Sequence, residues 1–406
     1  MAGRVPWLCV VTAAWLVAGS GCDCDGTSLV GDASDLPVNP AETIGDPCRT
    51  NDECDDGEPC NGEEECDPEH GRCVGGIPQA DFTQCTTSDG RYASCVDARC
   101  DLDYEEMFVP AGPFVMGCDS MGTLDCTMVA SPQHVVTLSA YFVDRYEITN
   151  RRYLRCQQHG TCPGGHDELR PSNNVAVARV NWYDAVAHCA YEGKRLPTEA
   201  EWEKAARGGC EIVAPSSCDE NDERDLPWDD PPLWDEPVDC LHANWIDDEP
   251  GCSGAPDLVG VRPAGRSPYG VDDMIGNVEE WPADCPRLYG DPCPDGCANP
   301  VGSCFEEPDP FAGQVMGTRG GSFRGAWDGL WWRGSRGVYQ LADSVGFRCA
   351  RPVDPDVPAI PVPAEVDAAT WGGMEDDRGT AEGTVGVAGG AGPGMLLAGG
   401  VSPRRP

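Results

Sequence analysis

Basic residues are scarce in this chain. It has 28 lysines and arginines against 69 aspartates and glutamates, which gives a formal net charge of −41. Because nucleic acids and anionic membrane surfaces are bound through basic patches, this deficit argues against either as the main partner. The abundance of glycine (50), proline (37) and cysteine (25) also argues against a coiled coil or a helical bundle.

Long apolar runs are also missing. The apolar stretch 5–18 is shorter than the roughly 20 residues that span a bilayer, and it is typical of a signal peptide. No later stretch reaches about 18 apolar residues, so we expect no transmembrane helix. Small residues precede Cys22 and resemble a bacterial lipobox. We therefore expect a signal peptide over 1–21 and a lipid anchor at Cys22, with plain secretion as the alternative.

Common catalytic motifs are absent as well. The histidines show no metal-ligand spacing such as HExxH, and the chain has no P-loop, nucleophile elbow or GxGxxG. These motifs therefore supply no catalytic site.

The 25 cysteines favour an oxidising, extracytoplasmic compartment in which most are paired. Eight lie from Cys48 to Cys100 and fourteen from Cys118 to Cys349. Both numbers are even, so each region could close its own disulfides.

Composition divides the remainder of the chain into four parts. Residues 22–47 are rich in Asp, Gly, Ser and Pro and are expected to form a flexible tether. Residues 48–100 have few large apolar side chains, which favours a small module held by disulfides. Most aromatic residues lie in 107–352, the expected main domain, whereas 353–406 lacks cysteine and is expected to be a disordered tail.

The main domain carries few signals of regular structure. Strands are expected over 108–117, where two surround a turn, and over 135–143. Three helices are expected: one capped at Thr149, one over 182–192 capped at Asn181, and one with a capping box of Thr198 and Glu201. The rest of the domain is expected to be mostly loop.

Five motifs of this domain occur in the order of one known family. They are FVPAGPFVMG (108–117), VDRYEITN (143–150), VNWYDAVAHCAYEGKRLPTEAEWE (180–203), YGVDDMIGNVEEW (269–281), and RGGSF (319–323) with GFRCA (346–350). Together they resemble the formylglycine-generating enzyme, or sulfatase-modifying factor, family. The resemblance covers 107–352 and implies a C-type-lectin-like α+β fold with little regular secondary structure.

The fourth motif predicts a calcium site. Asp273, Gly276, Val278 and Glu280 are spaced so that a tight loop can turn two carboxylates and two backbone carbonyls inward. Calcium prefers six to eight such oxygen ligands. The resemblance implies a structural calcium ion at these residues; the alternative is a solvated acidic loop. A second calcium site of the family is matched by Asn244 and Trp245, with Asp247, Asp248 or Asp257 as the candidate carboxylate.

The resemblance also implies a disulfide between Cys189 and Cys349, because the two matching cysteines of the family are bonded to each other. Two further pairs are suggested by proximity in the sequence alone: Cys156 with Cys162, and Cys210 with Cys218.

The copper chemistry of the family is not expected. Its enzymes oxidise a substrate cysteine to formylglycine with Cu(I) held by two cysteines that follow the Gly-Gly-Ser motif. Here those positions are Gly325 and Leu330, and no cysteine occurs between 305 and 348. Without thiolates the soft Cu(I) ion has no ligands. Glu279 also replaces a tryptophan of the family's oxygen pocket, and Ser322 is favoured as a turn residue.

Aromatic and arginine residues follow the Gly-Gly-Ser motif and could line a groove for a peptide, a glycan or an envelope protein. The alternative is that the tryptophans fill the core. The candidate groove residues are Ser322, Arg324, Trp327, Trp331, Trp332 and Arg333.

We therefore predict a non-catalytic binding or scaffold module of the cell envelope, with structural calcium and contact with the membrane only through its lipid anchor. The alternative is an oxidoreductase of the formylglycine-generating or nonheme-iron-associated type that acts from a site other than the copper cysteines.

Overall fold

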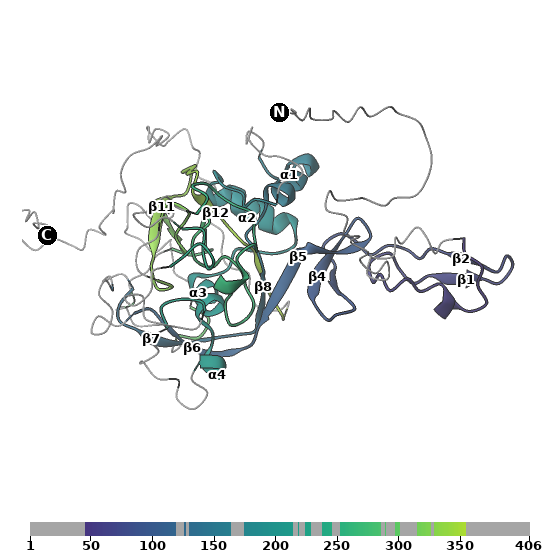
Figure 1. Ribbon diagram of the computed structural model, residues 1–406, viewed down its shortest axis with the longest axis horizontal. Helices are drawn as coiled ribbons and strands as arrows, with labels where there is room; N and C mark the ends of the chain where they lie inside the picture. Colours follow the sequence, from purple (N-terminus) through teal and green to yellow (C-terminus); the bar gives the residue numbers. More distant parts are fainter. Residues whose placement is uncertain are drawn as a thin grey trace, which may run out of the picture. The chain divides into compact units, whose positions relative to one another are not determined.

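A computed structural model describes residues 45–118, 126, 130–163, 174–213, 218, 224–228, 238–245, 252–285, 289, 297–300, 315–325 and 329–354 (Figure 1). The predicted signal peptide, Cys22 and the predicted tail beyond residue 354 lie outside these residues. The chain divides into two compact units. Of the described residues, the first unit contains 45–57 and 63–76, and the second contains 58–62 and the residues from Ile77 onward.

The first unit is held by two disulfides, Cys48–Cys66 and Cys54–Cys73. It contains one 3₁₀ turn, Asn51–Glu53, and the antiparallel strands β1 (Glu65–Asp67) and β2 (Arg72–Val74). Its buried cluster consists of cysteines alone. A unit with so little apolar surface depends on its bridges for stability, as the sequence indicates.

The second unit is built around a five-stranded antiparallel sheet in the order β13-β8-β5-β4-β3. Its strands are β3 (Gln84–Thr86), β4 (Tyr92–Val96), β5 (Arg99–Val109), β8 (Tyr141–Asp144) and β13 (Ala350–Pro352). The predicted boundary between a module ending at 100 and a domain starting at 107 is wrong, because β5 runs across it. The second half of the cysteine-rich region thus shares a sheet with the main domain, and the bridges Cys60–Cys95 and Cys85–Cys100 stabilise this part.

Three helices form where the sequence predicts them. Helix α1 (Asn150–His159) is capped by the Thr149 side chain, which accepts the Arg152 N–H, and it ends at Gly160 in the left-handed conformation. Helices α2 (Trp182–Tyr191) and α3 (Glu199–Arg207) each begin with a complete capping box, at Asn181 and Thr198. A short helix, α4 (Cys210–Val213), follows α3.

The remaining strands form short pairs. They are β6 (Gly112–Met116) with β7 (His134–Leu138), β10 (Val315–Thr318) with β11 (Gly334–Gly337), and the parallel pair β9 (Glu279–Glu280) with β12 (Val345–Gly346). One 3₁₀ turn, Pro263–Gly265, lies before the calcium motif. The domain is therefore α+β with little regular secondary structure, as predicted.

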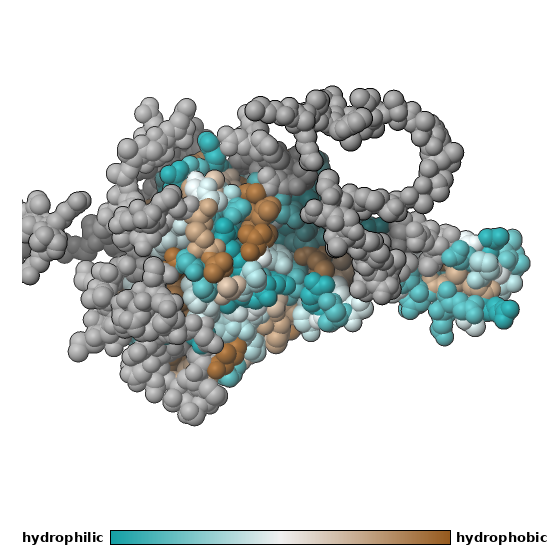
Figure 2. All heavy atoms as spheres, viewed as in Figure 1, coloured by the Kyte–Doolittle hydropathy of each residue, from teal (hydrophilic) through white to brown (hydrophobic). Residues whose placement is uncertain are grey.

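Two large buried clusters form the core of this unit, one beneath α2 and one beneath α3. Trp182, Trp202 and Trp281 are almost completely buried. Each indole N–H has an acceptor: the Pro282 carbonyl, the Glu280 carboxylate and the Val180 carbonyl, each at 2.9 Å. On the face shown in Figure 2, hydrophobic patches are separated by hydrophilic residues. Among the described residues, no helix has the length and apolar character needed to cross a membrane.

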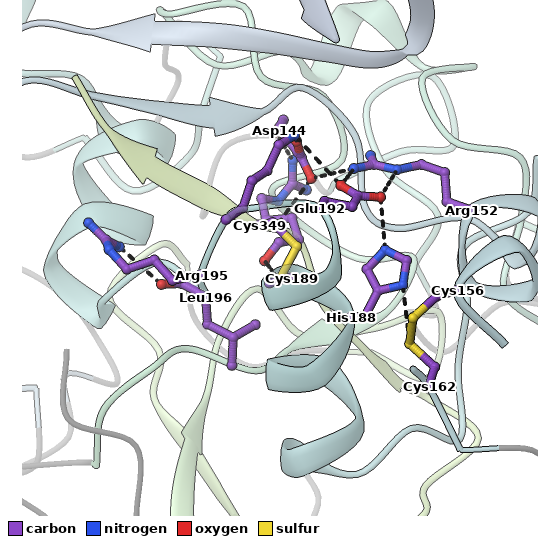
Figure 3. Close-up of a disulfide and its surroundings, with 12 residues drawn as sticks. Asp144, Arg152, Cys156, Cys162, His188, Cys189, Glu192, Arg195, Leu196 and Cys349 are labelled. Carbon is purple, nitrogen blue, oxygen red and sulfur yellow. Dashed lines mark hydrogen bonds and ion pairs between the residues drawn. A yellow bond between two sulfur atoms is a disulfide. The ribbon is translucent and has the colours of Figure 1, made fainter. Parts of the chain in front are cut away.

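The predicted disulfides of the main domain are confirmed. Cys189 on α2 is bonded to Cys349, 160 positions later in the chain, and this bridge lies beside a group of buried charged side chains (Figure 3). The pairs Cys156–Cys162 and Cys210–Cys218 are also formed. In addition, Cys118 is bonded to Cys126, and Cys240 to Cys252.

Candidate metal centre

The loop that carries the predicted calcium ligands is held in a strained backbone conformation. Asp273 and Asn277 both have φ of +57°, and Gly276 has φ of +79°. The Gly276 N–H donates to the Gly320 carbonyl at 2.9 Å, and the Asn277 N–H donates to the Asn244 carbonyl at 2.9 Å. Glycine is required at position 276, because a Cβ there would clash with the Asn244 carbonyl oxygen. The structure thereby brings Asn244 next to the first calcium motif.

Besides Asp272 and Glu279, which pair with arginines of their own, three carboxylates are buried around this loop. Asp273 and Glu280 were expected from the sequence; Glu147 was not, although it lies within the second family motif. Glu147 accepts the Asn277 side-chain amide at 2.6 Å and the Val278 N–H at 3.1 Å. Burial, together with the charges of Asp273 and Glu280, raises the pKa of Glu147 well above its ordinary value.

Asp273 is only 4% exposed, and its Oδ2 accepts the Gly260 N–H at 2.6 Å. Burial raises the pKa of this carboxyl to about 6, although the Gly260 hydrogen bond opposes the shift. The free acid is therefore favoured at Asp273 more than in an ordinary aspartate.

Of these three carboxylates, Glu280 is paired with an arginine, Arg348. Arg348 donates two hydrogen bonds of 2.7 Å to the two oxygens of Glu280, and it also donates to the carbonyl oxygen of Asp272. Among the described residues, neither Glu147 nor Asp273 forms an ion pair. The buried negative charge therefore exceeds the positive charge at this loop, and a divalent cation bound by oxygen ligands fits that excess.

The second predicted calcium site has its polar groups engaged. The Asn244 amide donates to the Ala255 carbonyl at 2.9 Å, and its Oδ1 accepts the Ser253 hydroxyl at 3.0 Å. The Trp245 carbonyl accepts the Cys252 N–H at 3.4 Å, and Asp257 pairs with Arg262. Asp247 and Asp248 lie outside the described residues. Asn244 thus holds two loop segments together, and a cation at this position stays a prediction.

The two positions of the copper cysteines lie after β10. Gly325 closes a turn in which its N–H donates to the Ser322 carbonyl at 2.9 Å, while the Ser322 hydroxyl accepts the Arg324 N–H at 3.2 Å. Leu330 is 1% exposed and packs in the core cluster beneath α3. Neither position offers a sulfur, so the residues present do not fit a Cu(I) ion.

The comparison with protein families agrees with this geometry. Residues 94–353 match the family described as the sulfatase-modifying factor enzyme 1-like domain, which is well over half of the chain. The chain belongs to this family. The matched range begins within β4, so the sulfatase-modifying factor domain includes the strand that precedes β5.

Relatives of this domain include active and inactive proteins. The chain is 33% identical over 264 residues to the formylglycine-generating enzyme of Thermomonospora curvata, covering 53% of this chain and 81% of that protein. It is 30% identical over 207 residues to hercynine oxygenase of Mycolicibacterium smegmatis (43% of this chain, 44% of the relative) and 37% identical over 121 residues to the inactive C-alpha-formylglycine-generating enzyme 2 of Bos taurus (28% and 35%). The chain thus spans less than half the length of the last two relatives.

An ion pair occupies the region expected for the oxygen pocket of the sulfatase-modifying factor domain. Both oxygens of Glu279 accept hydrogen bonds from Arg336, at 2.7 and 2.8 Å. Glu279 is 6% exposed. A charged pair therefore stands where the resemblance implies an apolar indole.

The predicted groove residues of the sulfatase-modifying factor domain differ in how far they are buried. Trp331 is buried and its indole N–H donates to Asp225 at 3.1 Å, while Arg333 is buried against Glu199 and lies over the Tyr289 ring. The prediction that these two line an open groove is wrong, because both complete the core. Arg324 is exposed and pairs with Asp343, Trp332 is half-buried, and Trp327 lies outside the described residues.

Proposed function

We propose that this protein is a non-catalytic member of the sulfatase-modifying factor family and acts as a binding or scaffold module. The observation that carries the proposal is the absence of sulfur at Gly325 and Leu330. A buried leucine side chain cannot coordinate copper or relay a thiol, and a glycine has no side chain to do so. The bovine relative, named inactive, supports the existence of such members in the family.

The surroundings of these positions also support the proposal. The Leu330 backbone is enclosed, with its N–H donating to the Asp225 carbonyl at 2.9 Å and its carbonyl accepting Arg319 at 3.0 Å. The Glu279–Arg336 pair stands at a position of the family's oxygen pocket, and a charged pair is a poor neighbour for dioxygen, which prefers an apolar pocket. Restoring copper chemistry would therefore need more than a movement of side chains.

The proposal includes a structural calcium ion at the loop of Asp273, Gly276, Val278 and Glu280. It is supported by the buried carboxylates that Arg348 alone does not neutralise. The carboxylates of Asp273 and Glu280 and the carbonyls of Gly276 and Val278 would hold the ion. Calcium would fix this loop against the Gly-Gly-Ser turn, to which Gly276 is hydrogen-bonded.

We further propose that the protein acts outside the cytoplasm, attached through Cys22 or secreted. Nine disulfides among the described residues support an oxidising compartment. The partner is a peptide, a glycan or an envelope protein. Arg324 and Trp332 are the candidate groove residues that are at least partly accessible.

Metal content combined with oxygen consumption tests the proposal. The purified full chain is analysed for calcium, copper and iron by mass spectrometry, and oxygen uptake is measured with a Cys-x-Pro-x-Arg peptide. We expect calcium near one equivalent, no bound copper and no turnover, with an active formylglycine-generating enzyme as the positive control. Stoichiometric copper with turnover would overturn the proposal. Stoichiometric iron with oxygen uptake would support the oxidoreductase alternative, which is suggested by the similarity to hercynine oxygenase.

A further inference from the structure

A buried histidine of helix α2 contacts the disulfide that joins helix α1 to the turn after it (Figure 3). His188 on α2 is fully buried, and its Nδ1 lies 3.8 Å from the Sγ of Cys162, which is bonded to Cys156. Both sulfur atoms and a ring nitrogen of His188 lie within 4.8 Å of one another. The imidazole can therefore exchange a proton with either sulfur once the disulfide opens.

A carboxylate orients this imidazole. The Nε2 of His188 lies 3.0 Å from Oε1 of Glu192. Burial raises the pKa of Glu192, but Arg152 and His188 outweigh it, and the pKa falls below its ordinary value. An ionised carboxylate only accepts hydrogen bonds, so the neutral His188 carries its proton on Nε2. Its Nδ1 then presents a lone pair to Cys162.

One other described disulfide has ionisable neighbours: the sulfur of Cys349 lies within 4.8 Å of carboxylate oxygens of Asp144 and Glu192, which are acids and not an imidazole base. The sulfur atoms of Cys118, Cys189 and Cys252 contact backbone carbonyl oxygens only. Among the nine bridges in the described part of the chain, only Cys156–Cys162 has an ionisable side chain within hydrogen-bonding distance of a sulfur. A sulfur, a base and an orienting carboxylate in line are the arrangement that activates a cysteine thiol.

We propose that Cys156–Cys162 is a reactive disulfide that exchanges with the dithiol of a partner, with His188 carrying the proton and Glu192 positioning it. Attack begins at Cys162, because it lies in a turn whose flanking residues Thr161 and Pro163 are exposed. The partner sulfur bonds to Cys162, the Cys156–Cys162 bond breaks, and His188 transfers the proton of the incoming thiol to the Cys156 sulfur. The second partner thiol then displaces Cys162 as a thiol. The partner dithiol is oxidised to a disulfide, and both cysteines are reduced.

The groups around His188 make it the proton carrier. Tyr153 of α1 stacks on the imidazole at 5.5 Å between ring centroids, and burial raises the pKa of this phenol far above neutrality. Phe347 covers another side of the ring at 5.3 Å. The other charged groups contact Glu192 and not the imidazole ring. Arg152 forms an ion pair with the Glu192 carboxylate, and the Lys194 ammonium lies 3.7 Å from it. Asp144 pairs with both of these cations.

Partial reduction of the oxidised full chain tests the proposal. Dithiothreitol is the probe, free thiols are trapped with N-ethylmaleimide after an acid quench, and each bridge is followed by peptide mass spectrometry. The reduction rate of Cys156–Cys162 is divided by that of Cys240–Cys252 in the same molecule, which cancels the ionisation of the reagent. We expect this ratio to change with pH in the wild type, because a general base acts only in its unprotonated form.

His188→Gln keeps a hydrogen-bond donor for Glu192 but cannot carry a proton. We expect it to lower the ratio about tenfold or more and to make it independent of pH. His159→Gln is the matched control. His159 is the exposed last residue of α1, three positions before Cys162, and its ring contacts the Thr161 hydroxyl and not a sulfur. An unchanged ratio in His188→Gln would overturn the proposal. If that variant loosens the fold and all bridges are reduced faster, the wild-type ratio decides alone, and a ratio constant with pH refutes the proposal.

Discussion

Replacing Asp273 by asparagine should have opposite effects on the calcium-free and the calcium-bound protein. The folded Asp273 has a pKa of about 6, against 3.8 for an ordinary aspartate. A folded pKa above the unfolded value means that folding favours the protonated form. The contribution of this group to stability is therefore fully present below about pH 4 and is lost as the pH rises through 6.

The size of the effect follows from this shift. Two pKa units correspond to about 3 kcal/mol, which the ionised Asp273 costs the calcium-free protein at pH 7. Asparagine retains an oxygen for the Gly260 N–H and carries no charge. We expect Asp273→Asn to raise the free energy of unfolding by up to about 3 kcal/mol in calcium-free buffer, with the difference from wild type vanishing near pH 4.

Calcium should reverse the order. An ion at 100 times its dissociation constant stabilises the wild type by about 2.7 kcal/mol, and most of this gain should be lost in Asp273→Asn. Urea unfolding with and without calcium measures both effects, with Asp343→Asn as the control because Asp343 is exposed and pairs with the exposed Arg324. If Asp273→Asn is less stable than wild type without calcium and keeps the full calcium response, the reasoning about this loop is wrong.

Three further substitutions test the packing. Replacing both Cys189 and Cys349 by serine should lower the free energy of unfolding in urea by about 4 to 5 kcal/mol, because the bridge closes a long loop in the unfolded chain. A loss below about 1 kcal/mol would contradict this expectation. Thr198→Ala should cost about 1 kcal/mol by removing the cap of α3, while Thr198→Ser should cost much less. Arg333→Ala should lower the free energy of unfolding by about 3 to 5 kcal/mol, because Glu199 is left buried without its partner. The control Arg324→Ala, at an exposed residue, should change it by less than about 1 kcal/mol. Equal effects of the two variants would argue against a core role for Arg333.

Local signals predicted the helices well. The caps at Thr149, Asn181 and Thr198 depend on side chains within three residues, and all three are formed. The bridges Cys156–Cys162 and Cys210–Cys218 also follow from proximity. Helix α2 ends one residue earlier than expected, at Tyr191.

Long-range features were harder to predict. The boundary placed between 100 and 107 failed because strand pairing across the sheet is not encoded in the local composition of β5. Trp331 and Arg333 were assigned to a groove because residue type does not report burial. The pairing of Glu280 with Arg348 and the position of Glu147 were likewise invisible, since their partners come from distant motifs.

The continuity of β5 limits how this protein can be shortened. A recombinant fragment starting at Met107, just before the first family motif, would keep only the end of that strand and would lose β1 to β4 and four bridges. The cut would also remove Glu106, the residue of β5 that pairs with both Tyr92 of β4 and Asp144 of β8, and the sheet would shrink to three short strands. A fragment that begins at Gly45 retains the whole sheet and both partners of every N-terminal bridge, whereas a start at Glu58 would leave Cys66 and Cys73 without Cys48 and Cys54.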